Sequence, residues 1–103
     1  MHPIQALRTL PARMPHIEFT SQLAQHVDCP PGRSVEATSL REALEVVFSD
    51  YPQLRGYVLD DQGAIWKHIA VFIDGEMIHQ RDHLDVAVGS NGEIFVMQAL
   101  SGG

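Results

Sequence analysis

The sequence predicts an α+β fold in which a mixed sheet of four to five strands carries one main helix packed across one face. Two strand-like segments come first, a single strongly amphipathic helix follows, and more strand-like segments occupy the rest of the chain. Elements ordered in this way are typical of α+β domains. The connection between the first and last strands is long enough for these two strands to run parallel at the centre of the sheet.

Composition sets the class of protein. The chain has 103 residues, 45% hydrophobic and 19% charged, which are ordinary values for one globular domain. Its net charge of −6 argues against a nucleic acid partner and favours a partner with a basic docking surface. Cys29 is the only cysteine, so no internal disulfide is expected. The sequence shows no secretory apolar run and no membrane span, so we expect a cytoplasmic protein without a membrane partner.

The first elements are an extension and a hairpin. Residues 1–15 contain three prolines and are expected to form a flexible N-terminal extension. Alternating apolar and polar residues from Ile17 to Leu23 predict a strand with one buried face. Residues 26–29 predict a second strand, which the Pro-Pro-Gly at residues 30–32 ends. Together the two strands indicate a hairpin.

The main helix is predicted over residues 40–50. Its apolar stripe follows the i, i+3, i+4, i+7, i+8 spacing of a helix face and consists of Leu40, Ala43, Leu44, Val47 and Phe48. Ser39 and Glu42 have the spacing of a capping box, in which both side chains bond backbone N–H groups at the helix start. Pro52 disfavours helical backbone at the residue before it, so the helix should end near Asp50.

The second half of the chain is predicted to be mostly strand. Residues 52–63 are expected to form a loop that ends in a turn. Asp74-Gly75 between two apolar runs predicts a tight hairpin turn with positive φ. Residues 82–92 should contain a short strand or a turn, and residues 93–100 the final strand. These elements give a domain over residues 16–100, followed by a flexible tail at residues 101–103.

Three segments, taken in order, resemble a known family. "SLREALEVVFSDYPQL", "DDQGAIWKHIAVFIDGE" and a final "EIFVMQALSGG" are similar to the MoaD/ThiS family of ubiquitin-like sulfur carriers. The likeness covers roughly residues 16 to 103. This family includes the small subunit of molybdopterin synthase and the sulfur carrier of thiamin biosynthesis. The resemblance implies a ubiquitin-like β-grasp fold.

The resemblance also implies a function. An E1-like adenylyltransferase would use ATP to adenylate the carboxylate of Gly103, with Gly102 beside it, and the carboxylate would become a thiocarboxylate. The sulfur would go to cofactor, amino-acid or tRNA thiolation through a sulfurtransferase or a sulfur-accepting synthase. The chain itself would be a co-substrate without a bound cofactor. It would not be an enzyme, although it could be the small subunit of a synthase.

This chemistry explains the residues at the end of the sequence. A carboxylate is a poor electrophile, and joining it to AMP supplies a leaving group that a sulfur nucleophile can displace. The tail must enter the partner's active site in an extended form, where β-carbons on Gly102 and Gly103 would collide with the channel walls. We expect Leu100 to anchor the end of the last strand and Ser101 to act as a small polar spacer.

Strand alternation predicts a docking surface near this tail. If Ile94 and Val96 point toward the helix, then Phe95 and Met97 point away from it, and Phe72 of the preceding strand does the same. One helix covers only one face of a sheet, so these three side chains should form an exposed apolar patch. Such patches are typical of interaction sites. The alternatives are that residues 1–15 or a second copy of the chain covers them.

Two other functions compete with the carrier hypothesis. The chain could be a protein modifier joined through Gly103 to target lysines, and Lys67, the only lysine, would limit self-linked chains. It could also be a plain β-grasp interaction module. No metal site is expected, because His79 and His83 are not predicted to share a helix face. No nucleophile, base and orienting group can be named together, which argues against an enzyme acting through its own side chains.

Overall fold

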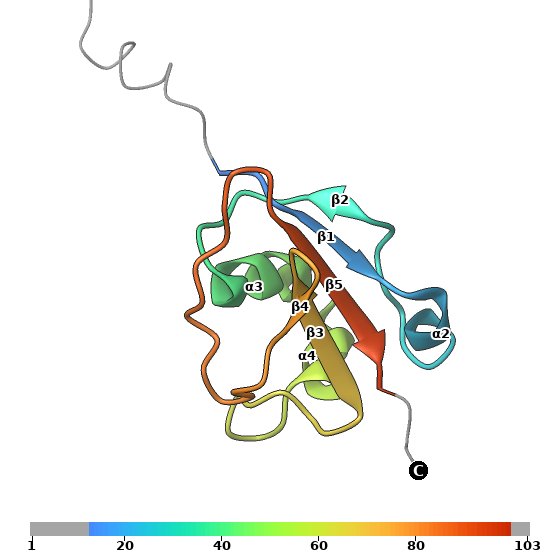
Figure 1. Ribbon diagram of the computed structural model, residues 1–103. Coiled ribbons are helices and arrows are strands. Elements are labelled where there is room, and N and C mark those ends of the chain that lie inside the picture. The colour runs from blue at the N-terminus through green and yellow to red at the C-terminus, as the bar shows by residue number, and fades with distance from the viewer. Residues whose placement is uncertain (1–12, 100–103) are drawn as a thin grey trace, which may run out of the picture.

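A computed structural model describes residues 13–99 and shows a five-stranded mixed sheet with its main helices on one face (Figure 1). The elements are β1 (His16–Phe19), α2 (Ser21–Ala24), β2 (Arg33–Ser34), α3 (Leu40–Asp50), α4 (Pro52–Val58), β3 (Ile69–Ile73), β4 (Glu76–Met77) and β5 (Glu93–Gln98). The strand order is β2-β1-β5-β3-β4. The predicted α+β class is confirmed, but two further helices accompany the main one. Within the described range, no helix combines the length and the apolar character needed to cross a membrane.

The centre of the sheet is the parallel pair of β1 and β5. Ile17 lies opposite Ile94 and Phe19 opposite Val96, and all four side chains are buried on the face that the helices cover. The backbone pairing continues before β1, because Met14 N–H donates to the carbonyl of Ser90 at 3.3 Å. The predicted parallel arrangement of the first and last strands is therefore confirmed.

Helix α3 has the bounds that the sequence predicts. The Ser39 hydroxyl accepts a hydrogen bond from the Glu42 N–H at 3.2 Å, which is the first half of the predicted capping box. In the second half of a capping box the Glu42 carboxylate would accept a hydrogen bond from the Ser39 N–H. Here it accepts two from Thr38 instead, one from the backbone N–H at 2.7 Å and one from the hydroxyl at 2.8 Å. Both bonds favour the ionised carboxylate, so they hold the pKa of Glu42 below its ordinary value.

The predicted loop over residues 52–63 is wrong in its first half, because Pro52–Val58 forms α4. Pro52 occupies the first turn, where a missing N–H costs no hydrogen bond, and Leu54 and Val58 are buried one helical turn apart. Arg55 joins α4 to α3, since it pairs with Glu45 and lies 5.1 Å from the centre of the Phe48 ring. Gly56 lies inside α4, and because glycine has a low helix propensity the sequence favoured a loop over this segment.

The first hairpin differs from its prediction in both strands. The strand predicted to reach Leu23 ends at Phe19, because the alternation needs an apolar residue at Ser21 and α2 begins there instead. Leu23 is still buried, but from a helix. The strand predicted at residues 26–29 is also wrong: β2 follows the Pro-Pro-Gly segment and pairs with β1. Gly32 approaches β1 so closely that an added Cβ would lie 2.9 Å from His16 Nε2.

The second hairpin and its turn are confirmed. Asp74 and Gly75 both have positive φ, 52° and 86°, and join β3 to β4. The Asp74 carboxylate accepts from the Glu93 N–H at 2.9 Å, which ties this turn to β5. Residues 82–92 form turns and one isolated bridge, Ser39 with Ala87, instead of a strand. Backbone carbonyls of this segment accept hydrogen bonds from the first N–H groups of α3, including one from the Leu40 N–H to the Val86 carbonyl at 2.9 Å.

Two neighbouring valines of α3 test how much of the stability comes from its buried face. Val47 is fully buried and Val46 is 37% exposed. Val47→Ala should lower the free energy of unfolding by about 1.5–3 kcal/mol, because it removes buried methyl groups and leaves a cavity. Val46→Ala gains the same helix propensity and loses less buried surface, so it should cost clearly less than Val47→Ala. Urea denaturation measures both, and equal losses would contradict the assigned helix face.

The Glu42 contacts predict a pH dependence. Because the folded-state pKa of Glu42 is lowered, its contribution to stability is present above the unfolded-state pKa and is lost as the pH falls through the folded-state pKa. Glu42→Gln should therefore be less stable than the parent near neutrality, and the two should converge in acid. Urea midpoints across the acidic range measure this difference. Thr38→Val removes the hydroxyl donor and should shrink this pH-dependent difference, and an unchanged difference would count against the Thr38 contacts as the cause.

Candidate functional site

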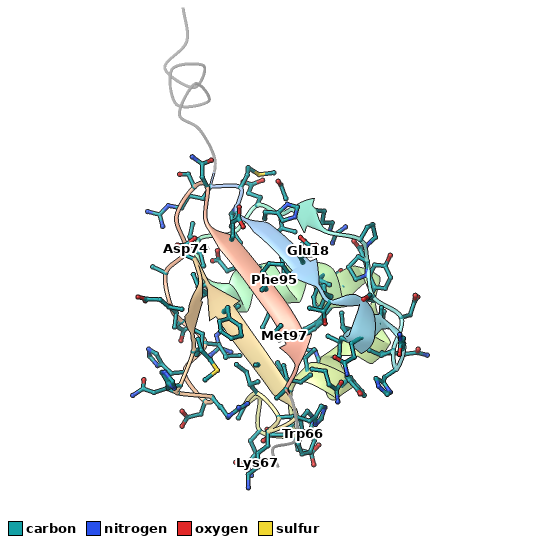
Figure 2. The ribbon with its side chains drawn as sticks, turned by 45° about the vertical axis from the view of Figure 1, so that its right-hand side comes forward. Glu18, Trp66, Lys67, Asp74, Phe95 and Met97 are labelled. Carbon is teal, nitrogen blue, oxygen red and sulfur yellow. The ribbon has the colours of Figure 1, made fainter. Side chains whose placement is uncertain are left out.

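The face of the sheet turned away from α3 and α4 carries an apolar patch. Side chains of β5 alternate, so Ile94 and Val96 are buried under the helices while Phe95 is 40% exposed on the other face. Phe72 of β3 lies directly opposite Phe95, and Met97 follows on the same side of β5. Figure 2 shows Phe95 and Met97 on this open face. All three side chains point away from the helices as the sequence predicts, but only Phe95 is exposed, because Phe72 and Met97 are half-buried.

The patch has a fourth member that the sequence reasoning missed. Met77 of β4 pairs with Phe72 and is 40% exposed. Counting outward from the two-residue turn at Asp74-Gly75 would have placed Met77 opposite Phe72, because the length of a hairpin turn sets the register. We define the open-face patch as Phe72, Met77, Phe95 and Met97. Three of these side chains, with Gly75, line a shallow hollow of about 240 Å³.

The predicted acceptor residues cannot be placed in the same way. Leu100, Ser101, Gly102 and Gly103 lie outside the described residues. The structure follows the chain as far as Ala99, whose N–H donates to the carbonyl of His68 at 2.7 Å. The last described residue therefore lies just after β5, beside the residue that precedes β3.

A cluster of rings stands at this end of the sheet. The His68 ring packs edge-on against Tyr57 at 5.0 Å and stacks on Trp66 at 5.9 Å. Trp66 Nε1 donates to the Gly56 carbonyl at 2.9 Å, and the Tyr57 hydroxyl donates to the Gln98 side chain at 3.3 Å. These contacts join α4 to the end of β5. Sequence reasoning missed the cluster because it assigned the Tyr57 segment to a loop.

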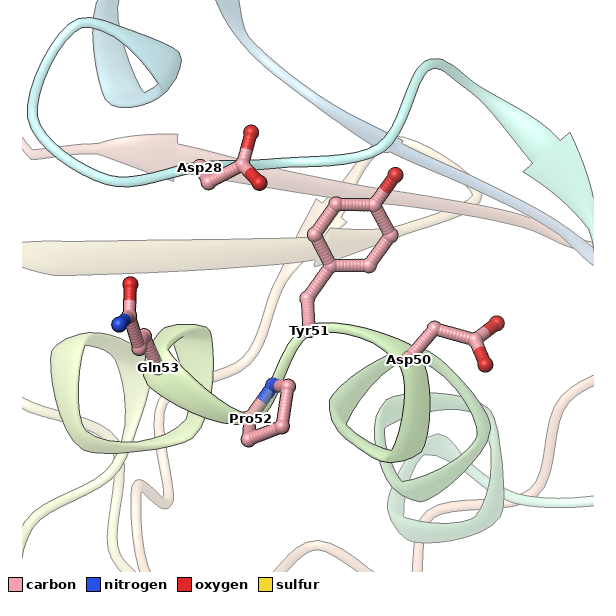
Figure 3. A pocket seen from close by; sticks show the side chains of 5 residues that line it. All are labelled: Asp28, Asp50, Tyr51, Pro52 and Gln53. Atoms are coloured by element: carbon pink, nitrogen blue, oxygen red, sulfur yellow. The ribbon is translucent and has the colours of Figure 1, made fainter.

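A second concave surface lies on the helical side, where the segment after α2 passes over the junction of α3 and α4 (Figure 3). Its volume is about 360 Å³, and its lining consists of Asp28, Asp50, Tyr51, Pro52 and Gln53. Burial and the Asp28 carboxylate raise the pKa of the neighbouring Cys29 thiol above its ordinary value. A raised pKa leaves less thiolate, so Cys29 is a poor nucleophile. This surface does not combine a nucleophile with a base.

The histidines do not assemble a metal centre in the described structure. Within residues 13–99, no three His, Cys, Asp or Glu side chains are close enough together to hold a metal ion. The features that gather near the end of β5 are instead apolar and aromatic. This composition suits contact with another macromolecule.

No protein-family model and no curated protein matches the sequence. Solved structures do match. SAMP1 from Haloferax volcanii is 22% identical with a TM-score of 0.68, and the match covers 87% of this chain and 99% of that one. CysO in the Amycolatopsis orientalis BexX/CysO complex structure is 15% identical with a TM-score of 0.70, covering 86% and 99%. Urm1 from Trypanosoma brucei is 14% identical with a TM-score of 0.63, covering 91% and 99%. The chain therefore has the ubiquitin-like β-grasp fold that its resemblance to the MoaD/ThiS family predicts.

Proposed function

We propose that this protein is a ubiquitin-like sulfur carrier whose Gly103 carboxylate is adenylated by an E1-like enzyme and then converted to a thiocarboxylate. The observation that carries the proposal is the position of β5. This strand is central in the sheet, presents Phe95 and Met97 on the open face, and leads through Ala99 into the last residues of the sequence. One strand thus joins a docking surface to a Gly-Gly segment.

The structural neighbours support the general class. They are ubiquitin-like sulfur carrier and modifier proteins, and the β-grasp domains of SAMP1, CysO and Urm1 align with nearly their full lengths. One of them was solved in a complex, that of BexX and CysO. Function on a shared fold must be argued from the site, which here is the end of β5 and its surroundings.

The chemistry assigns separate roles to the carrier and its partners. The activating enzyme binds ATP, transfers AMP to the Gly103 carboxylate and releases pyrophosphate. Sulfide then displaces AMP directly, or a sulfurtransferase persulfide displaces it to give an acyl disulfide that a thiol cleaves, and either route leaves a thiocarboxylate. A sulfur-accepting synthase takes the sulfur and returns the carboxylate. In this scheme the chain is a co-substrate and binds no cofactor of its own.

The open-face patch is the proposed docking surface for these enzymes. Phe72, Phe95 and Met97 supply flat or flexible apolar contacts, which are enriched where proteins associate. Leu100 would fix the point at which the tail departs, and Ser101 would be the spacer before Gly102. A partner that covers the patch can then take up the tail, since Phe95 and Met97 belong to β5 and the tail continues this strand.

A second candidate function shares the activation step. Two Haloferax volcanii structures that match the fold, at 22% and 20% identity, are named small archaeal modifier proteins. A modifier would pass its Gly103 acyl group to a lysine of a target protein instead of receiving sulfur. The two functions differ only in the nucleophile that attacks the adenylate, so the fold does not separate them.

Intact-mass spectrometry of the protein from its own cells separates these functions. A carrier should show a fraction in which one oxygen is replaced by sulfur, and digestion should place the change on Gly103. Conjugates of higher mass, linked through Gly103 to other proteins, would instead establish the modifier. A matched chain without Gly102 and Gly103 should show neither product. If the parent chain also shows neither in cells that contain its activating enzyme, both functions are contradicted.

The docking role of the patch predicts the effect of Phe95→Asp. The change should weaken complex formation with the activating enzyme at least about tenfold. It should also lower the melting temperature without unfolding the domain, because the ring is only 40% exposed and the new carboxylate faces Glu18 across the central strand pair. Isothermal titration calorimetry measures the affinity. Val46→Asp, which adds the same charge on the solvent face of α3, is the matched control and should bind normally. Equal weakening by both variants would mean that net charge, not the patch, controls binding.

A further inference from the structure

A hollow outside the open-face patch lies at the end of the sheet where β5 ends. Its volume is about 610 Å³, and its lining includes Trp66, Lys67, His68 and Arg81 but no residue of the patch. Figure 2 shows Trp66 and Lys67 beyond this end of the sheet. The backbone joins the hollow to β5, because the His68 carbonyl accepts the Ala99 N–H at 2.7 Å.

Arg81 holds together the two chain segments that form the hollow. Its carbonyl accepts the Ile65 N–H at 2.9 Å. Its Nη1 donates to the carbonyl of Trp66 at 2.5 Å and to that of Ile69 at 2.7 Å. These bonds tie the segment before β3 to the segment after β4, so the hollow is preformed. Both side-chain bonds use Nη1, and the guanidinium has three further N–H groups on Nε and Nη2.

Trp66 gives the hollow a rigid apolar surface. Its Nε1 donates to the Gly56 carbonyl and its ring stacks on His68, yet the residue is 39% exposed. An aromatic ring that is already held in place loses little entropy when a partner covers it. Trp and Arg are also enriched among the residues that dominate the energy of protein interfaces. The hollow therefore has the composition of a protein contact site.

The hollow carries positive charge on an acidic protein. The net charge of the chain is −6. Within residues 13–99, neither Lys67 nor Arg81 forms an ion pair with a carboxylate. Three other arginines do form such pairs: Arg33 with Asp50, Arg41 with Asp85 and Arg55 with Glu45. The two cations that line the hollow can thus meet an acidic group of a partner.

Carboxylates near the hollow restrict the kind of partner. Asp60 belongs to the lining, but its Oδ1 accepts two backbone N–H groups of its own turn, at 2.8 and 3.0 Å. Asp61 and Asp82 are exposed and each follows a lining residue in sequence. A polyanion such as RNA would be repelled by these carboxylates and by the net charge of the protein. A single acidic side chain on a folded partner avoids most of this repulsion.

We infer that this hollow receives an acidic side chain of the activating enzyme, and that an apolar neighbour of that side chain packs on the Trp66 ring. The inference rests on the proposed function, since that enzyme acts on the chain that continues from β5. The remaining N–H groups of Arg81 donate to the carboxylate, and Lys67 adds a second positive charge. Because the rest of the protein is acidic, this one positive contact fixes the orientation in which the enzyme docks.

Surface plasmon resonance with the activating enzyme from the same cells tests the inference on the full chain. Lys67→Glu changes an exposed residue, so it should leave the melting temperature nearly unaltered. It should lower the association rate constant at least about fivefold at low salt, and the loss should shrink as salt screens the attraction. Asp61→Asn removes a carboxylate beside the hollow and should instead raise the association rate constant.

Arg13→Glu is the matched control. It makes the same change of charge at an exposed residue that bonds the Val88 carbonyl and lies outside the hollow, so its effect should be much smaller. Direct contact has a separate readout, because Lys67 is the only lysine. Its amine should react with acetic anhydride more slowly in the saturated complex than in the isolated protein, as measured by mass spectrometry of the Lys67 peptide.

Three results would each overturn the inference: equal losses for Lys67→Glu and Arg13→Glu, tighter binding of Lys67→Glu, or an amine that the enzyme does not protect. These results would leave the proposed function standing, because the cellular mass measurement decides the activation of Gly103 separately. If the parent chain itself did not bind the activating enzyme, both would be contradicted.

Discussion

The parallel pairing of β1 with β5 is the constraint on which the rest of the structure depends. Two adjacent parallel strands need a long connection that crosses from one end of the sheet to the other. Here α3 and α4 lie within that connection and cover one face, where the side chains of Ile17 and Val96 are buried. Among residues 13–99, no helix covers the other face of β5 and β3. The open-face patch is thus a product of the topology as much as of its own residues.

Polar contacts organise the part of the molecule where the sheet is weakest. Strand β4 has only two residues, and the chain then runs to β5 without another strand. Backbone carbonyls of this segment satisfy the first N–H groups of α3, and Arg41 of the helix pairs with Asp85 at 2.8 Å. A helix start leaves four N–H groups without intrahelical partners, so the segment supplies acceptors that the helix lacks, and the helix holds the segment in place. Removal of either would expose the core beneath Leu84.

The elements predicted well from sequence are those specified locally. Helix α3 has a full apolar stripe and a capping serine, and the turn at Asp74-Gly75 depends on two adjacent residues. Helix α4 was missed because its two buried residues form too short a pattern to outweigh an internal glycine. The strand at Arg33–Ser34 is too short to show an alternating apolar pattern, and it forms because the unpaired backbone groups at the edge of β1 are available to it. The ring cluster at His68 likewise depends on which segments the fold brings together. Gly102 and Gly103 follow the described part of the chain, and the role proposed for them comes from the resemblance and the chemical argument.

The bond between Ala99 and His68 also sets how the domain bears a mechanical load. In the proposed function, a partner that drew the tail into its active site would pull along β5, while the hydrogen bonds of β5 to β3 run across that direction. Bonds arranged in this way share the force and must yield together, unlike a strand that is peeled from an edge one bond at a time. Tension applied at the tail would therefore be resisted by all the hydrogen bonds between β5 and β3 together. The domain could stay folded while a partner acts on the residues after Ala99.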